Sequence, residues 1–135
     1  MKSRMCLVAI TAGLAFAAPN VFAATVHATL LDDAIQLDSS AAAAGKVTFV
    51  VTNASKTLPH EFVVLKTDTA QDQLPLMANG KVDERKASNK GEAENIAPGK
   101  TKKLTLKLPA GNYALVCNVA GHYKMGMHAA FTVNN

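Results

Sequence analysis

The stretch "KLTLKLPAGNYALVC" (Lys103–Cys117) contains two predicted strands and the turn between them. In its first half Leu104, Leu106 and Leu108 alternate with polar residues, which is the pattern of a strand with one buried face. The "PAG" at 109–111 then turns the chain, and "YALVC" continues as a run of aromatic, apolar and β-branched residues. The stretch therefore predicts two consecutive strands of a β-protein.

The same pattern continues on both sides of this stretch. Further runs rich in β-branched and aromatic residues, bounded by Gly, Pro and Asn, predict strands at 46–53, 61–67 and 129–134, with weaker ones at 24–30 and 34–38. The polar segment 70–95 is expected to be a long loop that carries a short helical turn and one or two weak strands. About seven to eight short strands at this spacing predict an all-β sandwich of two packed sheets.

The first residues predict export. Lys2 and Arg4 precede an apolar run at 7–18, and small residues follow up to Ala23, which is the arrangement of a secretory signal peptide. The run is too short to span a bilayer, so we expect cleavage after residue 23 and no stable membrane association of the mature chain. The prediction is a signal peptide at 1–23 and one domain at 24–135, in the periplasm.

Composition narrows the function classes. Without Lys2 and Arg4 the mature chain has 12 basic and 10 acidic residues, a balance that does not indicate a nucleic-acid partner. Lysines at 100, 102, 103 and 107 are interpreted first as a solvated strand face, and secondarily as a surface for an acidic partner. Cys6 leaves with the signal peptide, so Cys117 is the single remaining cysteine and no internal disulfide is available.

The segment "VCNVAGHYKMGM" (Val116–Met127) concentrates soft donor atoms just before the last predicted strand. Four residues separate Cys117 from His122, and four more separate His122 from Met127, while His60 opens an earlier strand. A thiolate, two imidazoles and a thioether are the donor set that favours copper. Taken singly, each residue is more often core filler or a surface side chain.

Two other chemistries fit part of this set. One cysteine and two histidines also accept zinc in a tetrahedral site. A thiol hydrolase or oxidoreductase would use Cys117 as nucleophile with His60 or His122 as base, but it needs an orienting third group and a substrate pocket.

With these residues in view, the chain resembles the cupredoxins, which are small blue copper proteins. The resemblance covers essentially the whole mature chain, and the Cys-x4-His-x4-Met spacing is similar to that of rusticyanin and sulfocyanin-like proteins. It implies a Greek-key β-sandwich and one type 1 copper ion, with His60, Cys117 and His122 as equatorial ligands and Met127 as the axial one. Met125 is the rival axial ligand. The glycine before Met127 matches the family pattern.

The resemblance also implies a function. The expected protein is a periplasmic carrier of single electrons, not an enzyme, that works as a monomer with transient redox partners. The edge of His122 would be the electron port, with Leu58, Pro59, Met125 and Gly126 around it. The alternative is a protein for copper delivery, storage or resistance, which the additional Met125 and a histidine at 128 would suit.

One position departs from the family pattern. Plastocyanin and azurin have an asparagine after the first histidine ligand, whereas this chain has Glu61. We hypothesise that Asn118 or Asn53 takes over the hydrogen bonding around the cysteine sulfur.

Four neighbouring residues are interpreted as lying outside the site. His27, in what reads as an edge strand, and His128, at the start of the last strand, are expected to be structural or surface residues. Tyr123 and Lys124 are expected on the exposed rim of the ligand loop.

Overall fold

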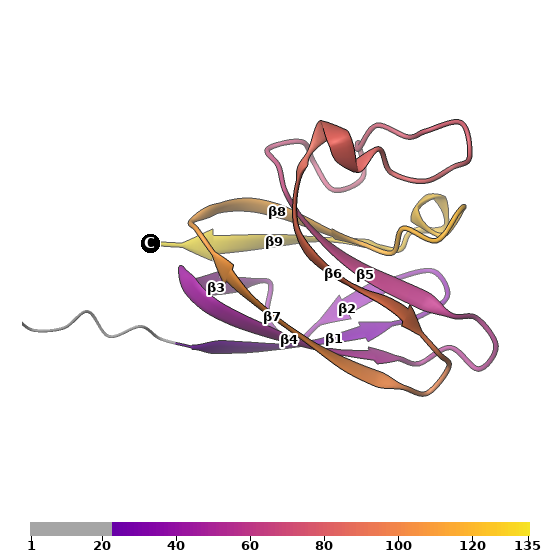
Figure 1. The fold of residues 1–135 in the computed structure, drawn as a ribbon, viewed down its shortest axis with the longest axis horizontal. Helices are drawn as coiled ribbons and strands as arrows, with labels where there is room; N and C mark the ends of the chain where they lie inside the picture. The colour runs from indigo at the N-terminus through magenta and orange to yellow at the C-terminus, as the bar shows by residue number, and fades with distance from the viewer. Residues whose placement is uncertain (1–22) are drawn as a thin grey trace, which may run out of the picture.

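A computed structural model describes residues 23–135, which form nine strands and two short 3-10 helices. The predicted signal peptide and Cys6 lie outside the described residues, apart from Ala23 at its end. Figure 1 shows the strands as two layers packed face to face. Within the described range no helix is long and apolar enough to cross a membrane.

The two sheets are mixed. One has the strand order β2-β1-β4-β7 and the other the order β3-β9-β8-β5-β6. Only β1 with β4 and β3 with β9 pair in parallel among the described strands. The strands are β1 (Ala24–Leu30), β2 (Ile35–Leu37), β3 (Ala41–Ala43), β4 (Gly45–Asn53), β5 (His60–Lys66), β6 (Ser88–Ile96), β7 (Thr101–Leu108), β8 (Gly111–Val116) and β9 (His128–Asn134). The all-β, two-sheet prediction is confirmed, with nine strands in place of seven to eight.

The core fills the space between the two sheets. Phe49 of β4 packs on Phe62 of β5 and Phe131 of β9, with ring centroids 5.3 and 5.4 Å apart. Leu108 at the end of β7 is buried, and Leu104 and Leu106 pack against the same cluster. The alternation in the opening stretch therefore marks the inner face of the first sheet, as predicted.

The strands that sequence reasoning undervalued lie at sheet edges. β6 is polar and buries only Ala93 and Ile96, yet it runs for nine residues alongside β5. β3 consists of three alanines paired with β9. Backbone hydrogen bonds to a neighbouring strand, which carry no side-chain signal, hold such edge strands in place.

The segment 67–87 covers the outer face of the second sheet. Leu74 and Val82 from this segment pack against Val63, Val116 and Tyr123 in a second, smaller core. Figure 1 shows the segment lying over β5 and β8, on the side away from the first sheet. The central strands of this sheet are therefore buried on both faces, which makes their ends rigid supports for side chains.

Candidate metal centre

Two of the predicted ligands stand at the ends of adjacent strands of the second sheet. His60 is the first residue of β5, and Cys117 directly follows β8. β5 and β8 are antiparallel, with Val63 opposite Val116, so the start of one lies beside the end of the other. The loop 117–127 then returns to β9 and carries His122.

Three of these side chains converge on one point. The Nδ1 atoms of His60 and His122 are 3.1 Å apart, and the Sγ of Cys117 lies 3.7 and 3.5 Å from them. His60 and Cys117 are fully buried, and His122 is 8% exposed. Among the described residues, this is the one group of nitrogen and sulfur donors close enough to share a metal ion.

The spacing fits a metal ion. Three donors separated by 3.1, 3.5 and 3.7 Å can all reach one ion, because protein metal–imidazole bonds are about 2.0–2.1 Å long and metal–thiolate bonds about 2.3 Å. An imidazole–imidazole–thiolate set with room for a weak axial sulfur is the set of blue copper sites. The residues present therefore fit the copper ion that the sequence analysis predicts.

Burial sets the protonation of the three donors. It lowers the pKa of both His60 and His122, and for His60 the neighbouring His122 lowers it further. Both imidazoles therefore favour the neutral form that binds metals. Burial also raises the pKa of the Cys117 thiol, against the opposing effect of backbone N–H groups of Glu61 and Val119. Without a metal, Cys117 therefore favours its protonated thiol form, which is a poor nucleophile.

The two methionines lie in different environments. Met127 is fully buried in the main core, and its backbone carbonyl accepts a hydrogen bond from the Cys117 N–H at 3.0 Å. Met125, in the 3-10 helix η2 (Tyr123–Met125), is 48% exposed. Met127 stays the predicted axial ligand, since its burial fits a side chain enclosed with the ion and equally one that packs in the core.

The backbone of Glu61 contacts the sulfur, although its side chain differs from the family pattern. The Glu61 N–H donates a hydrogen bond to Cys117 Sγ at 3.4 Å. The side chain of Asn53 instead donates to the carbonyls of Leu58 and Ile96, at 2.8 Å each. Asn53 thus closes the turn that leads into His60. The hypothesis that its side chain bonds to the sulfur is wrong, because both of these bonds go to backbone carbonyls.

Asn118 and Tyr123 tie the ligand loop to the segment 67–87. The Asn118 side chain accepts the Val82 N–H at 2.7 Å and donates to Glu84 at 2.6 Å, so it points away from the sulfur. The Tyr123 hydroxyl accepts the Leu74 N–H at 2.9 Å. Tyr123 is buried, and its expected place on the exposed rim is wrong because segment 67–87 covers it.

The remaining predictions for nearby residues have mixed outcomes. Lys124 is exposed, as expected. His27 is exposed, but β1 lies between β2 and β4, so its strand is an inner one and not an edge. His128 begins β9, and its ring packs on Tyr123 with centroids 5.1 Å apart. Neither histidine belongs to the donor cluster.

Sequence reasoning missed the turn between β1 and β2. Asp32 on this turn places Oδ1 at 3.4 Å from Nε2 of His60. An adjacent groove contains Asp32, Asp33, Lys56 and Met125 in its lining. Two consecutive acidic residues in a turn are ordinary in any sequence, so the pattern carried no signal for this contact.

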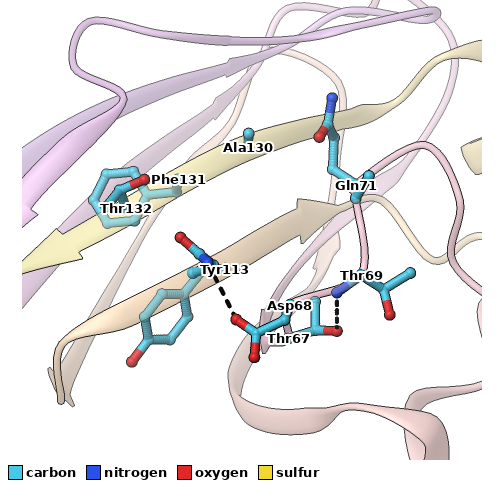
Figure 2. A pocket seen from close by; sticks show the side chains of 10 residues that line it. Thr67, Asp68, Thr69, Gln71, Tyr113, Ala130, Phe131 and Thr132 are labelled. Carbon is cyan, nitrogen blue, oxygen red and sulfur yellow. Dashed lines mark hydrogen bonds between the residues drawn. The ribbon is translucent and has the colours of Figure 1, made fainter.

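Other hollows and clusters do not contain the donor set. Figure 2 shows one between β8, β9 and the start of segment 67–87, where Tyr113, Thr132 and Asp68 are among the lining residues and the predicted ligands are not. Glu61 also lies in an all-carboxylate cluster with Glu84 and Glu92, and such clusters are common without an ion. Among the described residues, Cys117 does not line any of these four hollows.

The sulfocyanin (SoxE) domain family matches residues 32–135. The chain belongs to the sulfocyanin family. Sulfocyanins are cupredoxins, which are electron-transfer proteins with one type 1 copper ion and are generally not enzymes, so the resemblance and the copper prediction are confirmed at the level of the family. A search among curated proteins found no significant match.

Solved structures share the fold of this sulfocyanin-family chain at low sequence identity. Dithionite-reduced auracyanin from Roseiflexus castenholzii is 20% identical with a TM-score of 0.63, over 84% of this chain and 98% of that one. Auracyanin A from Chloroflexus aurantiacus, a blue copper protein, is 22% identical with a TM-score of 0.59, over 84% and 100%. Rusticyanin from Thiobacillus ferrooxidans is 19% identical with a TM-score of 0.62, over 82% and 76%.

Proposed function

We propose that the mature domain, residues 24–135, is a periplasmic carrier of single electrons. Its copper ion would be held by His60, Cys117 and His122, with the Met127 thioether as a weaker fourth ligand. The observation that carries this proposal is the convergence of two Nδ1 atoms and one Sγ within 3.7 Å of one another, in a site where two of the three residues are fully buried.

Copper bound at such a site cycles between Cu(I) and Cu(II) and so supplies the one-electron step. The chain's part is to keep the donors in place through that cycle. His60 and Cys117 stand at the ends of paired central strands, and the hydrogen bond from Glu61 N–H to Cys117 Sγ joins them directly. Burial excludes water, which would otherwise reorganise around each change of charge.

The route for the electron passes through His122. It is the ligand with measurable exposure, whereas His60, Cys117 and Met127 have none. Met125, whose N–H donates to the His122 carbonyl at 3.1 Å, is the one exposed large hydrophobic residue among those described, and Pro59, next to His60 in the chain, is also exposed. A small apolar contact of this kind suits a transient redox partner, because such encounters bury little surface.

The test is the visible absorption of the mature protein after one equivalent of Cu(II). We expect an intense thiolate-to-copper charge-transfer band that Cys117→Ala abolishes. His60→Gln and His122→Gln should also lose it, while His27→Gln, which alters an exposed histidine outside the cluster, should keep it. A colourless parent protein, or a weak band that survives Cys117→Ala, would contradict the proposal and favour zinc or a structural thiol.

Copper handling is the second candidate, and Met125 favours it, since an exposed thioether on a groove is accessible to an incoming Cu(I) ion. The two functions differ in exchange rate. A carrier should keep its copper through many redox cycles in the presence of a Cu(I) chelator, whereas a handling protein should release it within minutes. The enclosure of three of the four proposed ligands supports the carrier.

The periplasmic location rests on the signal-like first 23 residues. Expression of the full chain in a Gram-negative host, followed by cell fractionation, tests it. We expect the protein in the periplasmic fraction with Ala24 as its first residue. Intact chain in the cytoplasm or membranes would contradict the location without affecting the copper site.

A further inference from the structure

The second ring nitrogen of His60 has no ordinary partner. Nε2 is buried, and no described residue makes a hydrogen bond to it. The nearest acidic group is the Asp32 carboxylate, whose Oδ1 lies 3.4 Å away, slightly beyond normal hydrogen-bond length. The Asp32 side chain is 55% exposed, so it can move the few tenths of an ångström that separate the contact from a hydrogen bond.

Metal binding through Nδ1 creates a requirement at Nε2. A neutral imidazole that offers one nitrogen to a metal carries its proton on the other nitrogen. That N–H needs an acceptor when it is buried, and metal-bound histidines usually have one that orients the ring. In His60 the Nδ1 atom faces His122 and Cys117, so the proton belongs on Nε2, which faces Asp32.

The turn that carries Asp32 is held against the site on two sides. Ala54 donates a backbone hydrogen bond to Leu30 at 2.9 Å, which ties the turn to the segment leading into His60. On the other side the carbonyl of Asp33 packs against Gly126 of the ligand loop. Asp32 is therefore placed over His60 by backbone contacts, and the other charged residues that line the groove are Asp33 and Lys56.

We propose that Asp32 is a positioning residue for His60. In the copper-loaded protein its carboxylate accepts the Nε2–H of His60, holds Nδ1 toward the metal, and favours Cu(II) over Cu(I) through its negative charge. Asp32 thereby lowers the reduction potential of the site. This inference rests on the proposed function, since it presupposes that His60 is a ligand.

Three variants separate the charge from the hydrogen bond. Asp32→Asn removes the charge but keeps an oxygen that can accept a hydrogen bond from Nε2–H, while Asp32→Ala removes both the charge and the acceptor. Asp33→Asn is the matched control, because it removes the same charge from the next residue, for which no contact with His60 is found among the described side chains. All are measured as folded, copper-loaded proteins at one pH.

The first readout is the reduction potential. For Asp32→Asn we expect the ratio of Cu(II) to Cu(I) affinity to fall about tenfold, which for one electron is a rise of about 59 mV. Asp33→Asn should change that ratio less than threefold. If Asp32→Asn leaves the ratio within twofold of the parent, or if Asp33→Asn changes it as much, Asp32 has no specific role.

The second readout is NMR of the diamagnetic Cu(I) protein. We expect a slowly exchanging Nε2–H of His60 in the parent and in Asp32→Asn, and at least tenfold faster exchange in Asp32→Ala. Equal exchange rates in parent and Asp32→Ala would overturn the inference while the blue copper site stands. A parent protein that gives no blue band with copper would instead overturn the proposed function, and this inference with it.

Discussion

A β-carbon on Gly126 would stand 2.5 Å from the carbonyl oxygen of Asp33. The β1–β2 turn and the ligand loop meet at this point without space for a side chain. Gly126 also has a φ of 109°, in the left-handed region that glycine tolerates best. The glycine before the proposed axial methionine thus has two effects. It turns the loop, and it lets the Asp32–Asp33 turn approach the site.

Gly126→Ala tests this close approach, with Gly121→Ala as its matched control. Gly121 has a φ of 85° but nothing within 4 Å of its added β-carbon. Both variants should lose about 1–2 kcal/mol of unfolding free energy to left-handed strain, and Gly126→Ala about 1–3 kcal/mol more because the clash is with backbone. Urea unfolding of the two variants measures the difference. Equal losses of unfolding free energy would mean that the β1–β2 turn moves away from the added methyl group at no cost.

The choice of axial ligand is tested by Met127→Leu beside Met125→Leu. Met127→Leu should keep the fold at a cost below about 1.5 kcal/mol, since the volumes match. Loss of a weak axial sulfur should alter the visible and EPR spectra and raise the potential by on the order of 59 mV, a tenfold change in affinity ratio. Met125→Leu, at a 48% exposed position, should leave the spectra unchanged. The reverse pattern would assign Met125 to the axis.

Asn118 is predicted to stabilise the loop and not to tune the copper. Asn118→Ala leaves the buried Val82 N–H without its acceptor and should cost about 1–3 kcal/mol of unfolding free energy. Asn112→Ala, which removes an exposed bond to Asp68, should cost less than about 0.5 kcal/mol. The blue band and the potential should persist in both variants. A shifted potential in Asn118→Ala would restore the hypothesis that this side chain acts on the sulfur.

The copper-free protein should lose stability in mild acid. Folding lowers the pKa values of His60 and His122 below the ordinary 6.5, first through burial. The unfolded chain therefore binds more protons, and the stability present above pH 6.5 falls as the pH drops toward the folded pKa values. Urea unfolding midpoints between pH 8 and pH 5 measure this loss of stability. The loss should be smaller in a His60→Gln, His122→Gln double variant. Parallel profiles for parent and double variant would exclude these histidines as its cause.

Much of the centre could be predicted because its signals are local. Cys117, His122 and Met127 lie within eleven consecutive residues, and their spacing can be read from the sequence without knowledge of how the rest of the chain folds. The alternation in β7 is local in the same way, since neighbouring side chains on a strand point to opposite faces. His60 was found through its residue type and its place at a strand start, and β5 places it beside β8.

The features that escaped prediction depend on segments distant in the chain. β6 is a strand because β5 offers it a free edge, while its own polar residues argue against burial. Tyr123 is buried because the segment 67–87, about fifty residues earlier, lies over it.

The sequence by itself therefore determined the class of fold, the inner face of the strands and the donor types of the centre, because periodicity and ligand spacing are properties of short stretches. Only the tertiary structure decided which methionine is enclosed, which backbone N–H meets the sulfur and which carboxylate faces His60. Those contacts form when loops from separate parts of the chain pack together at one end of the sandwich. The sequence of one loop does not show which other loop it will pack against.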